Sequence, residues 1–311
     1  MGGKKCSGNR FPAGFFVLLI LFTSYTLTDA QIVEKKEGTG SYWPFAAYNF
    51  GSLGTRSPEA QIDLLKSTGY NGIILSCETK EDFENLDKYN EKAARIKDFK
   101  IAAVFERYNF TDSTSRQDRW RKVFDKIAGK GTQLWIIFGK KTDGITDGFI
   151  EAKLREIVSY AAQREVHVVL YPHSNCYIAS AEEAMPFVEK IDHPNLKLAV
   201  HLCHEIRAGN GSRMDEIFDR VKERIGAVTL AGTDSIADFS NPKKMDSSTI
   251  KPLGRGNYPL DRFVGPMIKS GYKGTVGFIN FKIEEAPENY LGASLKVWRN
   301  ISEIAKNKAE L

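Results

Sequence analysis

The 311-residue sequence lacks a disulfide framework, a strong charge bias and a long membrane-spanning run. Its four cysteines are irregularly spaced, and Cys77, Cys176 and Cys203 lie in or beside apolar segments, as is typical of buried thiols. The formal net charge of +5 is too small to support nucleic-acid binding. No Walker loop, dinucleotide fingerprint, Gly-x-Ser-x-Gly elbow or His-Glu-x-x-His motif is found, which argues against the enzyme classes that use them.

Residues 1–30 have the layout of a secretory signal peptide. Lys4, Lys5 and Arg10 precede an apolar run at positions 15–22, and the segment ends with a small-residue cleavage site after Ala30. The run is far shorter than the roughly 20 residues that cross a bilayer as a helix, so we expect cleavage and no stable membrane insertion. Export of a chain without evident disulfides favours a bacterial periplasm or the cell exterior. We therefore expect residues 31–311 to form a periplasmic or secreted product.

Short β-rich segments alternate with longer amphipathic segments along the rest of the chain. We expect strands at residues 45–50, 72–77, 101–105, 133–138, 167–171, 198–202, 227–230 and 276–280. We expect helices at residues 58–67, 86–96, 116–128, 149–163, 181–191, 214–223, 260–270 and 287–306. Eight such units predict an α/β fold, a single-domain (β/α)₈ TIM barrel. The remaining long stretch, 234–259, is either a lid or binding loop or a passive surface loop.

Polar residues gather where the predicted strands end. Residues 199–211 hold His201 and His204, two of the five histidines, followed by Glu205 and Arg207. Ligands of α/β barrels bind at the carboxyl ends of the strands, and side-chain alternation along each strand assigns further residues to the mouth. The predicted set is Glu106, Tyr171, His173, His201, His204, Glu205, Arg207, Asp234, Asn280 and Lys282.

Two kinds of chemistry suit this set, with or without a metal ion. His173, His201 and His204 could hold a divalent ion such as zinc, manganese, magnesium or iron. On a straight strand His201 and His204 would lie roughly 10 Å apart, so a shared ion requires a turn after Leu202.

Without a metal, the histidines suit general acid/base catalysis, with Glu106 and Glu205 as partners. The residues expected to bind substrate are Tyr171, His173, Arg207, Asp234, Asn280 and Lys282. The structural alternatives are that Glu205 only pairs with Arg207 and that Lys282 is a solvated strand end.

Several longer motifs resemble a known family over nearly all of residues 31–311. They are residues 64–73, Tyr171-Pro-His173, residues 201–205 with Ala208-Gly-Asn210, residues 230–234, residues 250–260 and residues 271–280. In these motifs the chain resembles the xylose-isomerase-like TIM barrels, often labelled sugar phosphate isomerases/epimerases and related to the endonuclease IV barrel. The resemblance implies the barrel fold and a carbohydrate substrate.

The resemblance also implies a divalent ion held by glutamate, aspartate, histidine and glutamate from four late strands. In this sequence those positions fall on Tyr171, His201, Thr229, and Ile279 or Asn280. Every carboxylate of the set is replaced, while His173 and His204 match substrate-side histidines of the pattern. A rearranged metal site and a metal-free site are therefore equal expectations.

We predict an exported isomerase- or epimerase-like enzyme that moves a proton next to a carbonyl of a sugar, keto-sugar or glycoside, with lyase or hydrolase chemistry as variants. His201 and His204 would act as bases or metal ligands. The alternative is a non-catalytic carbohydrate-binding barrel that has lost the metal site, with Trp43, Tyr48, Tyr171 and Tyr258 as stacking surfaces. A nuclease activity is opposed by export, low positive charge and few metal ligands. In both cases the partner is a small carbohydrate and not a nucleic acid.

Overall fold

Eight parallel strands close into a barrel in chain order, with β8 hydrogen-bonded to β1. The computed structural model describes residues 43–113 and 117–309, and the predicted signal peptide lies outside them. The strands are β1 (Phe45–Tyr48), β2 (Gly72–Ser76), β3 (Lys100–Tyr108), β4 (Gln133–Phe138), β5 (Val168–Leu170), β6 (Leu196–His201), β7 (Ile225–Leu230) and β8 (Val276–Phe278). The predicted (β/α)₈ TIM barrel is confirmed.

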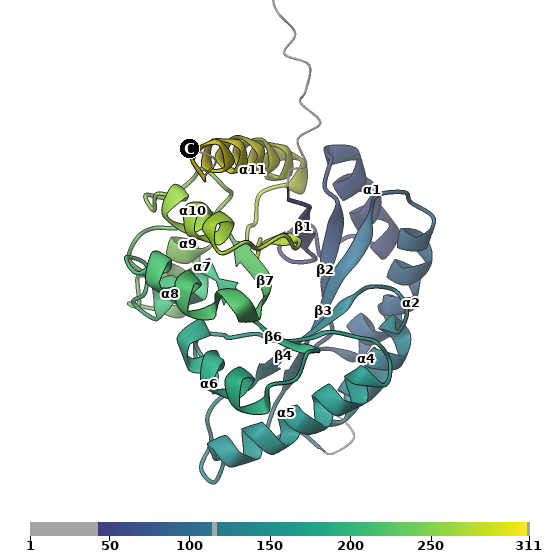
Figure 1. Cartoon of the computed structure of the whole chain (residues 1–311). Helices are drawn as coiled ribbons and strands as arrows, with labels where there is room; N and C mark the ends of the chain where they lie inside the picture. Colours follow the sequence, from purple (N-terminus) through teal and green to yellow (C-terminus); the bar gives the residue numbers. More distant parts are fainter. Residues whose placement is uncertain (1–42, 114–116, 310–311) are drawn as a thin grey trace, which may run out of the picture. The chain divides into compact units, whose positions relative to one another are not determined.

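Helices surround the barrel on all sides (Figure 1). They are α1 (Pro58–Thr68), α2 (Lys80–Ala94), α4 (Arg119–Ile127), α5 (Asp147–Ala162), α6 (Ala181–Ile191), α7 (Leu202–Arg207), α8 (Met214–Val221), α9 (Pro242–Thr249), α10 (Asp261–Lys269) and α11 (Pro287–Ala309), with a 3₁₀ turn, η1 (Lys222–Arg224), after α8. Residues 43–113 and 117–309 contain no helix long and apolar enough to cross a membrane.

Local capping signals set several helix boundaries. Ser57 caps α1 and Pro58 occupies its first turn, and Gly69 ends the helix in the left-handed conformation (φ 101°) that glycine adopts without strain. Helix α2 begins six residues before the predicted residue 86. Its start is a capping box, in which the Thr79 hydroxyl accepts from the Asp82 N–H and the Asp82 carboxylate accepts from the Thr79 N–H.

Two helices occur where the sequence predicted none. Helix α7 follows β6 directly and begins at Leu202, which the sequence placed inside the strand; no side-chain cap marks its start. Helix α9 lies within the stretch predicted to be irregular, where Asn241 caps it and Pro242 opens it. Both helices lie on the side of the barrel where the strands end, so they shape its mouth.

Side chains fill the interior of the barrel, as in other barrels of this size. Gly277 in β8 marks the inward face, because a Cβ built there would meet Ile74 Cδ1 at 2.7 Å and Thr229 Cγ2 at 2.8 Å. Since strand residues alternate between faces, Ile279 follows Gly277 inward while Phe278 and Asn280 face the helices. The prediction that Asn280 faces the barrel mouth is therefore wrong.

Candidate functional site

A cavity of about 330 Å³ opens at the carboxyl ends of the strands, a volume that suits a small molecule. Aromatic and aliphatic side chains, including Tyr48, Phe105 and Ile279, form much of its wall. Six residues predicted from the sequence line it together: Tyr171, His173, His201, His204, Arg207 and Lys282. The stretch 234–259 also contributes Met245, Asp246 and Ile250, so part of it belongs to the binding region.

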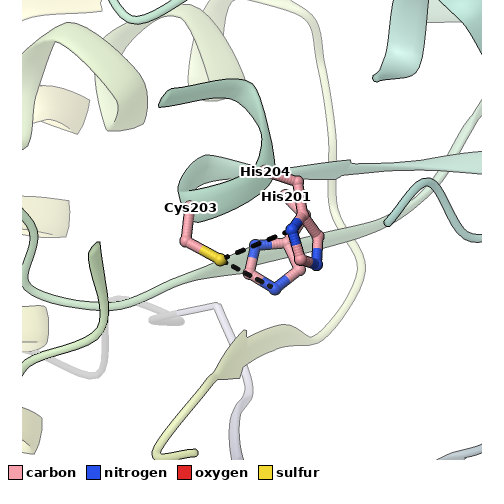
Figure 2. A group of neighbouring side chains, drawn as sticks. All are labelled: His201, Cys203 and His204. Carbon is pink, nitrogen blue, oxygen red and sulfur yellow. Dashed lines mark hydrogen bonds between the residues drawn. The ribbon is translucent and has the colours of Figure 1, made fainter. Parts of the chain in front are cut away.

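Three histidine rings lie close together in this cavity, tilted relative to one another. The ring centroid of His204 lies 4.1 Å from that of His201 and 4.2 Å from that of His173. The approach depends on α7: the chain turns from β6 into this helix at His201, which brings residues 201 and 204 to one side (Figure 2). The turn needed for the two histidines to share a ligand is therefore present.

Burial keeps these imidazoles neutral. It lowers the pKa of His173 to about 4, helped by the positive charge of Arg107, and it lowers the pKa values of His201 and His204 well below the ordinary value. The neighbouring histidines lower the pKa values of His201 and His204 further, because two imidazolium charges at this distance would repel each other. At neutral pH each ring therefore has one nitrogen with a free lone pair.

Hydrogen bonds fix which nitrogen carries the proton in two of the rings. His173 Nδ1 lies 2.8 Å from the Ser174 carbonyl oxygen, which can only accept, so Nδ1 is the donor and Nε2 carries the lone pair. His204 Nδ1 accepts from the Ser174 N–H at 3.3 Å, so its proton is on Nε2. The cavity thus holds a basic nitrogen on His173 and an N–H donor on His204.

Cationic side chains flank the histidines and are held by carboxylates. Arg207 is nearly buried and donates to Asp246 Oδ1 at 2.9 Å, and also to Thr249 Oγ1 and Ser174 Oγ. Lys282 contacts the other oxygen of Asp246 at 2.8 Å. Across the cavity, Arg107 pairs with Glu78 at 2.6 Å. Guanidinium groups fixed in this way can stabilise negative charge that develops on a bound ligand.

Four predicted site residues lie away from the cavity. Glu106 in β3 faces the helices and pairs with Arg119 of α4 at 2.6 Å, while its neighbours Phe105 and Arg107 line the cavity. The predicted orientation of Glu106 is wrong because both faces of a barrel strand are apolar, and the pattern cannot tell them apart. Asn280 is fully buried and donates to the Phe50 carbonyl and to Tyr290 Oη, which agrees with its helix-side position.

The other two residues outside the cavity are Glu205 and Asp234. Glu205 does not pair with Arg207 but accepts from the Ala181 N–H at the start of α6 and from Asn210 Nδ2. Asp234 pairs with Lys251 and accepts from the Asn257 N–H, which holds the segment after β7 together. Both carboxylates have structural partners instead of facing a ligand.

The metal ligands implied by the family resemblance do not fit this barrel. Tyr171 Oη is hydrogen-bonded to Tyr48 Oη at 2.7 Å, Thr229 is fully buried, and Ile279 is apolar. None of these three side chains supplies a carboxylate, so a hard cation such as magnesium or manganese would lack its preferred ligands here. Among the described residues, the cluster capable of holding a metal is instead His201, Cys203 and His204, whose donor atoms lie within 4.8 Å of one another.

The sequence did not reveal several important residues. Arg107, Glu78 and Asp246 were missed, and so was the role of Ser174 between His173 and His204. The parity error in β3 hid Arg107, since it selected Glu106 in its place. Asp246 lies in α9, a helix that was not predicted, and nothing in the local sequence links it to Arg207 about forty residues earlier.

Comparisons with known proteins support the same fold. A family model described as "Xylose isomerase-like TIM barrel" matches residues 139–301. Among curated proteins, none matches this sequence significantly.

Among solved structures, a xylose isomerase-like TIM barrel/4-hydroxyphenylpyruvate dioxygenase fusion protein matches with a TM-score of 0.70 and 16% identity, over 87% of this chain and 44% of that protein. The chain thus spans less than half of the fusion protein. An L-ribulose 3-epimerase matches with a TM-score of 0.60 and 14% identity, over 86% of this chain and 96% of its own. The IolI protein with a bound zinc atom matches with a TM-score of 0.64 and 15% identity, over 85% of this chain and 98% of its own. Together with the closed eight-stranded barrel, the family match shows that this chain belongs to the xylose isomerase-like TIM barrel family.

Proposed function

We propose that this protein is a sugar-modifying enzyme that moves a proton on the carbon next to a carbonyl group. The observation that carries the proposal is the cluster of neutral histidines beside Arg107 and Arg207 in the cavity. Family membership and the similarity to an epimerase support a sugar as the substrate class. The cavity volume of about 330 Å³ suits a monosaccharide-sized ligand.

His173 is the best placed general base. Its Nε2 carries the lone pair because Nδ1 donates to the Ser174 carbonyl, and this bond also orients the ring. In the proposed step, His173 Nε2 takes the proton from the carbon, and the electron pair of that bond moves onto the carbonyl oxygen. Arg207 and Arg107 stabilise the resulting oxyanion, and the N–H of His204 donates a hydrogen bond to it. Protonation of the same carbon on its opposite face completes an epimerisation. Protonation of the former carbonyl carbon, together with transfer of the neighbouring hydroxyl proton to the oxyanion, completes an isomerisation.

Proton exchange with solvent tests this step. The protein is incubated in D₂O with a panel of keto-sugars and glycosides, and loss of the C–H signal next to the carbonyl is followed by NMR. We expect exchange with at least one sugar, and His173→Gln should slow it by about a hundredfold or more, the usual contribution of a general base. The matched control is His167→Gln, because His167 is exposed and lies at the opposite end of β5. Equal exchange rates in the two variants would refute the role of His173.

The replaced family ligands favour a second candidate, a barrel that binds a carbohydrate without turning it over. Five aromatic side chains line the cavity and provide apolar faces against which a sugar ring could pack: Tyr48, Phe50, Phe105, Tyr171 and Phe281. A thermal-shift screen with sugars separates the two candidates. Stabilisation by a sugar that shows neither exchange nor turnover supports the binding barrel and contradicts the enzyme.

We also propose that the protein is exported. The support is the basic, apolar and small-residue order of residues 1–30. Terminal sequencing of protein recovered from the periplasm or culture medium should begin at Gln31. Recovery of only the uncleaved chain inside the cell would contradict export.

A further inference from the structure

Where the family's carboxylate ligands are replaced, the structure brings three other metal-binding side chains together. His201 ends β6, and Cys203 and His204 lie in the first turn of α7. Figure 2 shows the Cys203 thiol pointing at both imidazole rings. We propose that His201, Cys203 and His204 form a binding site for a soft or borderline cation, with zinc as the expected occupant.

The distances suit tetrahedral coordination. Cys203 Sγ lies 3.7 Å from His201 Nε2 and 3.7 Å from His204 Nδ1. Zinc bonds of about 2.3 Å to sulfur and about 2.0 Å to nitrogen at a tetrahedral angle place the sulfur and nitrogen about 3.5 Å apart. Both sulfur–nitrogen distances are close to this value, and all three donor atoms lie within 4.8 Å of one another, so a shift of side-chain torsions is needed to close the site around an ion.

The surroundings of His201 also point to a missing partner. Its ring is fully buried, and its Nδ1 has no hydrogen-bond partner among the described residues. Its Nε2 contacts the weakly polar thiol of Cys203. In the neutral ring the unpaired Nδ1 can carry the proton, which leaves the lone pair on Nε2, and binding of Nε2 to an ion would replace its weak thiol contact with a strong bond.

His204 can join the site at modest cost. Its Nδ1 now accepts from the Ser174 N–H at 3.3 Å and from Ser174 Oγ at 3.2 Å, both longer than a typical bond. Ser174 Oγ also accepts from Arg207 and keeps that contact when Nδ1 binds an ion. Because His204 Nε2 keeps its proton, the hydrogen-bond donor proposed for catalysis is preserved.

The ligand types select the metal. A thiolate with two imidazoles prefers zinc or copper(I) over magnesium, calcium or manganese, which bind oxygen. Three protein ligands leave a fourth position, and all three residues line the cavity, so a small ligand in the cavity could reach the ion. Cation binding at these residues is independent of the proposed proton transfer, and either could be correct without the other.

Cobalt(II) is the probe, because a cobalt–thiolate bond gives a near-ultraviolet charge-transfer band that does not depend on activity. The full chain is stripped with a chelator and titrated with cobalt without oxygen. We expect one cobalt per chain, a thiolate band, displacement by equimolar zinc and no displacement by a large excess of magnesium. Cys203→Ser should lose the band, whereas the control Cys77→Ser should keep it, since Cys77 is buried outside the cavity.

Histidine variants keep the test decisive if Cys203→Ser does not fold, as judged by circular dichroism. His201→Gln and His204→Gln should each weaken cobalt affinity by about tenfold or more, because each removes one ligand while the thiolate remains. A wild-type protein without a thiolate band overturns the site. So does a band that persists in folded Cys203→Ser, or wild-type cobalt affinity in both histidine variants.

Discussion

Protonation of His173 should destabilise the fold as the pH falls from 7 to 5. Burial and the charge of Arg107 lower its pKa in the folded protein to about 4, against an ordinary value of 6.5. Between these two values the unfolded chain binds more protons than the folded protein, so acidification favours unfolding. Integrating over the interval from pH 7 to pH 5 gives a loss of about 2 kcal/mol from this one residue.

Glu205 acts in the opposite direction over the same interval. Burial raises its pKa to about 7 from an ordinary 4.5, so here the folded protein binds more protons, and its stability contribution is lost as the pH rises through 7. Acidification from pH 7 to pH 5 therefore adds about 2 kcal/mol from Glu205. These two contributions nearly cancel each other, while His201 and His204, whose pKa values burial also lowers, add further destabilisation at low pH, so only variants separate the contribution of His173.

The assay is urea unfolding followed by circular dichroism at pH 7 and pH 5, at one ionic strength and with a chelator present. On going from pH 7 to pH 5, the unfolding free energy of His173→Gln should fall by about 2 kcal/mol less than that of wild type, because the variant cannot take up the proton. His167→Gln is the control, since that side chain is exposed. If His173→Gln and wild type show the same pH difference, His173 is not held neutral by its surroundings and the argument for its basic nitrogen fails.

Three further predictions concern stability. Glu205→Gln should lower the unfolding free energy at pH 7, measured by urea titration, by about 1–3 kcal/mol. The glutamine has one amide oxygen, so one of the two N–H donors, from Ala181 or Asn210, would face an NH₂ group and lose its acceptor. Unchanged stability would contradict the anchoring role of Glu205. Arg119→Met should cost about 3–5 kcal/mol, because it leaves the buried Glu106 carboxylate without its ion-pair partner; a loss below about 1 kcal/mol would show that this pair is not needed. Gly277→Ala should lower the melting temperature at a cost of about 1–3 kcal/mol, since the added Cβ meets Ile74 and Thr229 in the barrel interior, whereas Gly265→Ala, with open space around its Cβ, should not.

The barrel was predictable from the sequence because its signals are local. Each strand is a short apolar run, and residues such as Ser57, Pro58 and Gly69 mark helix ends through their own backbone chemistry. Errors of a few residues arose where a cap lay outside the apolar pattern, as at Thr79 before α2. Helix α7 escaped prediction because it has six residues, and its start carries no capping side chain.

The site was predictable only in part, because its geometry depends on distant residues. Six residues predicted from the positions of strand ends reach the same cavity: Tyr171, His173, His201, His204, Arg207 and Lys282. Glu106 and Asn280 were misplaced, since strand alternation gives two faces but no information on which face is inward when both are apolar. The pairing of Arg207 with Asp246 requires the position of α9, which only the folded chain defines.

This barrel has neutral side chains at the positions where the family resemblance implies carboxylate ligands, and this difference has an electrostatic consequence for the fold. Several carboxylates gathered in one cavity repel each other, and they must bind a cation or take up protons to remain buried. Tyr171, Thr229 and Ile279 carry no charge at neutral pH, and burial keeps His201 uncharged as well. The barrel can therefore close around this cavity without an ion, while its histidine lone pairs and the Cys203 thiol remain available to one. Metal binding in this protein should accordingly raise the melting temperature without being required for folding, which a chelator-treated sample can show directly.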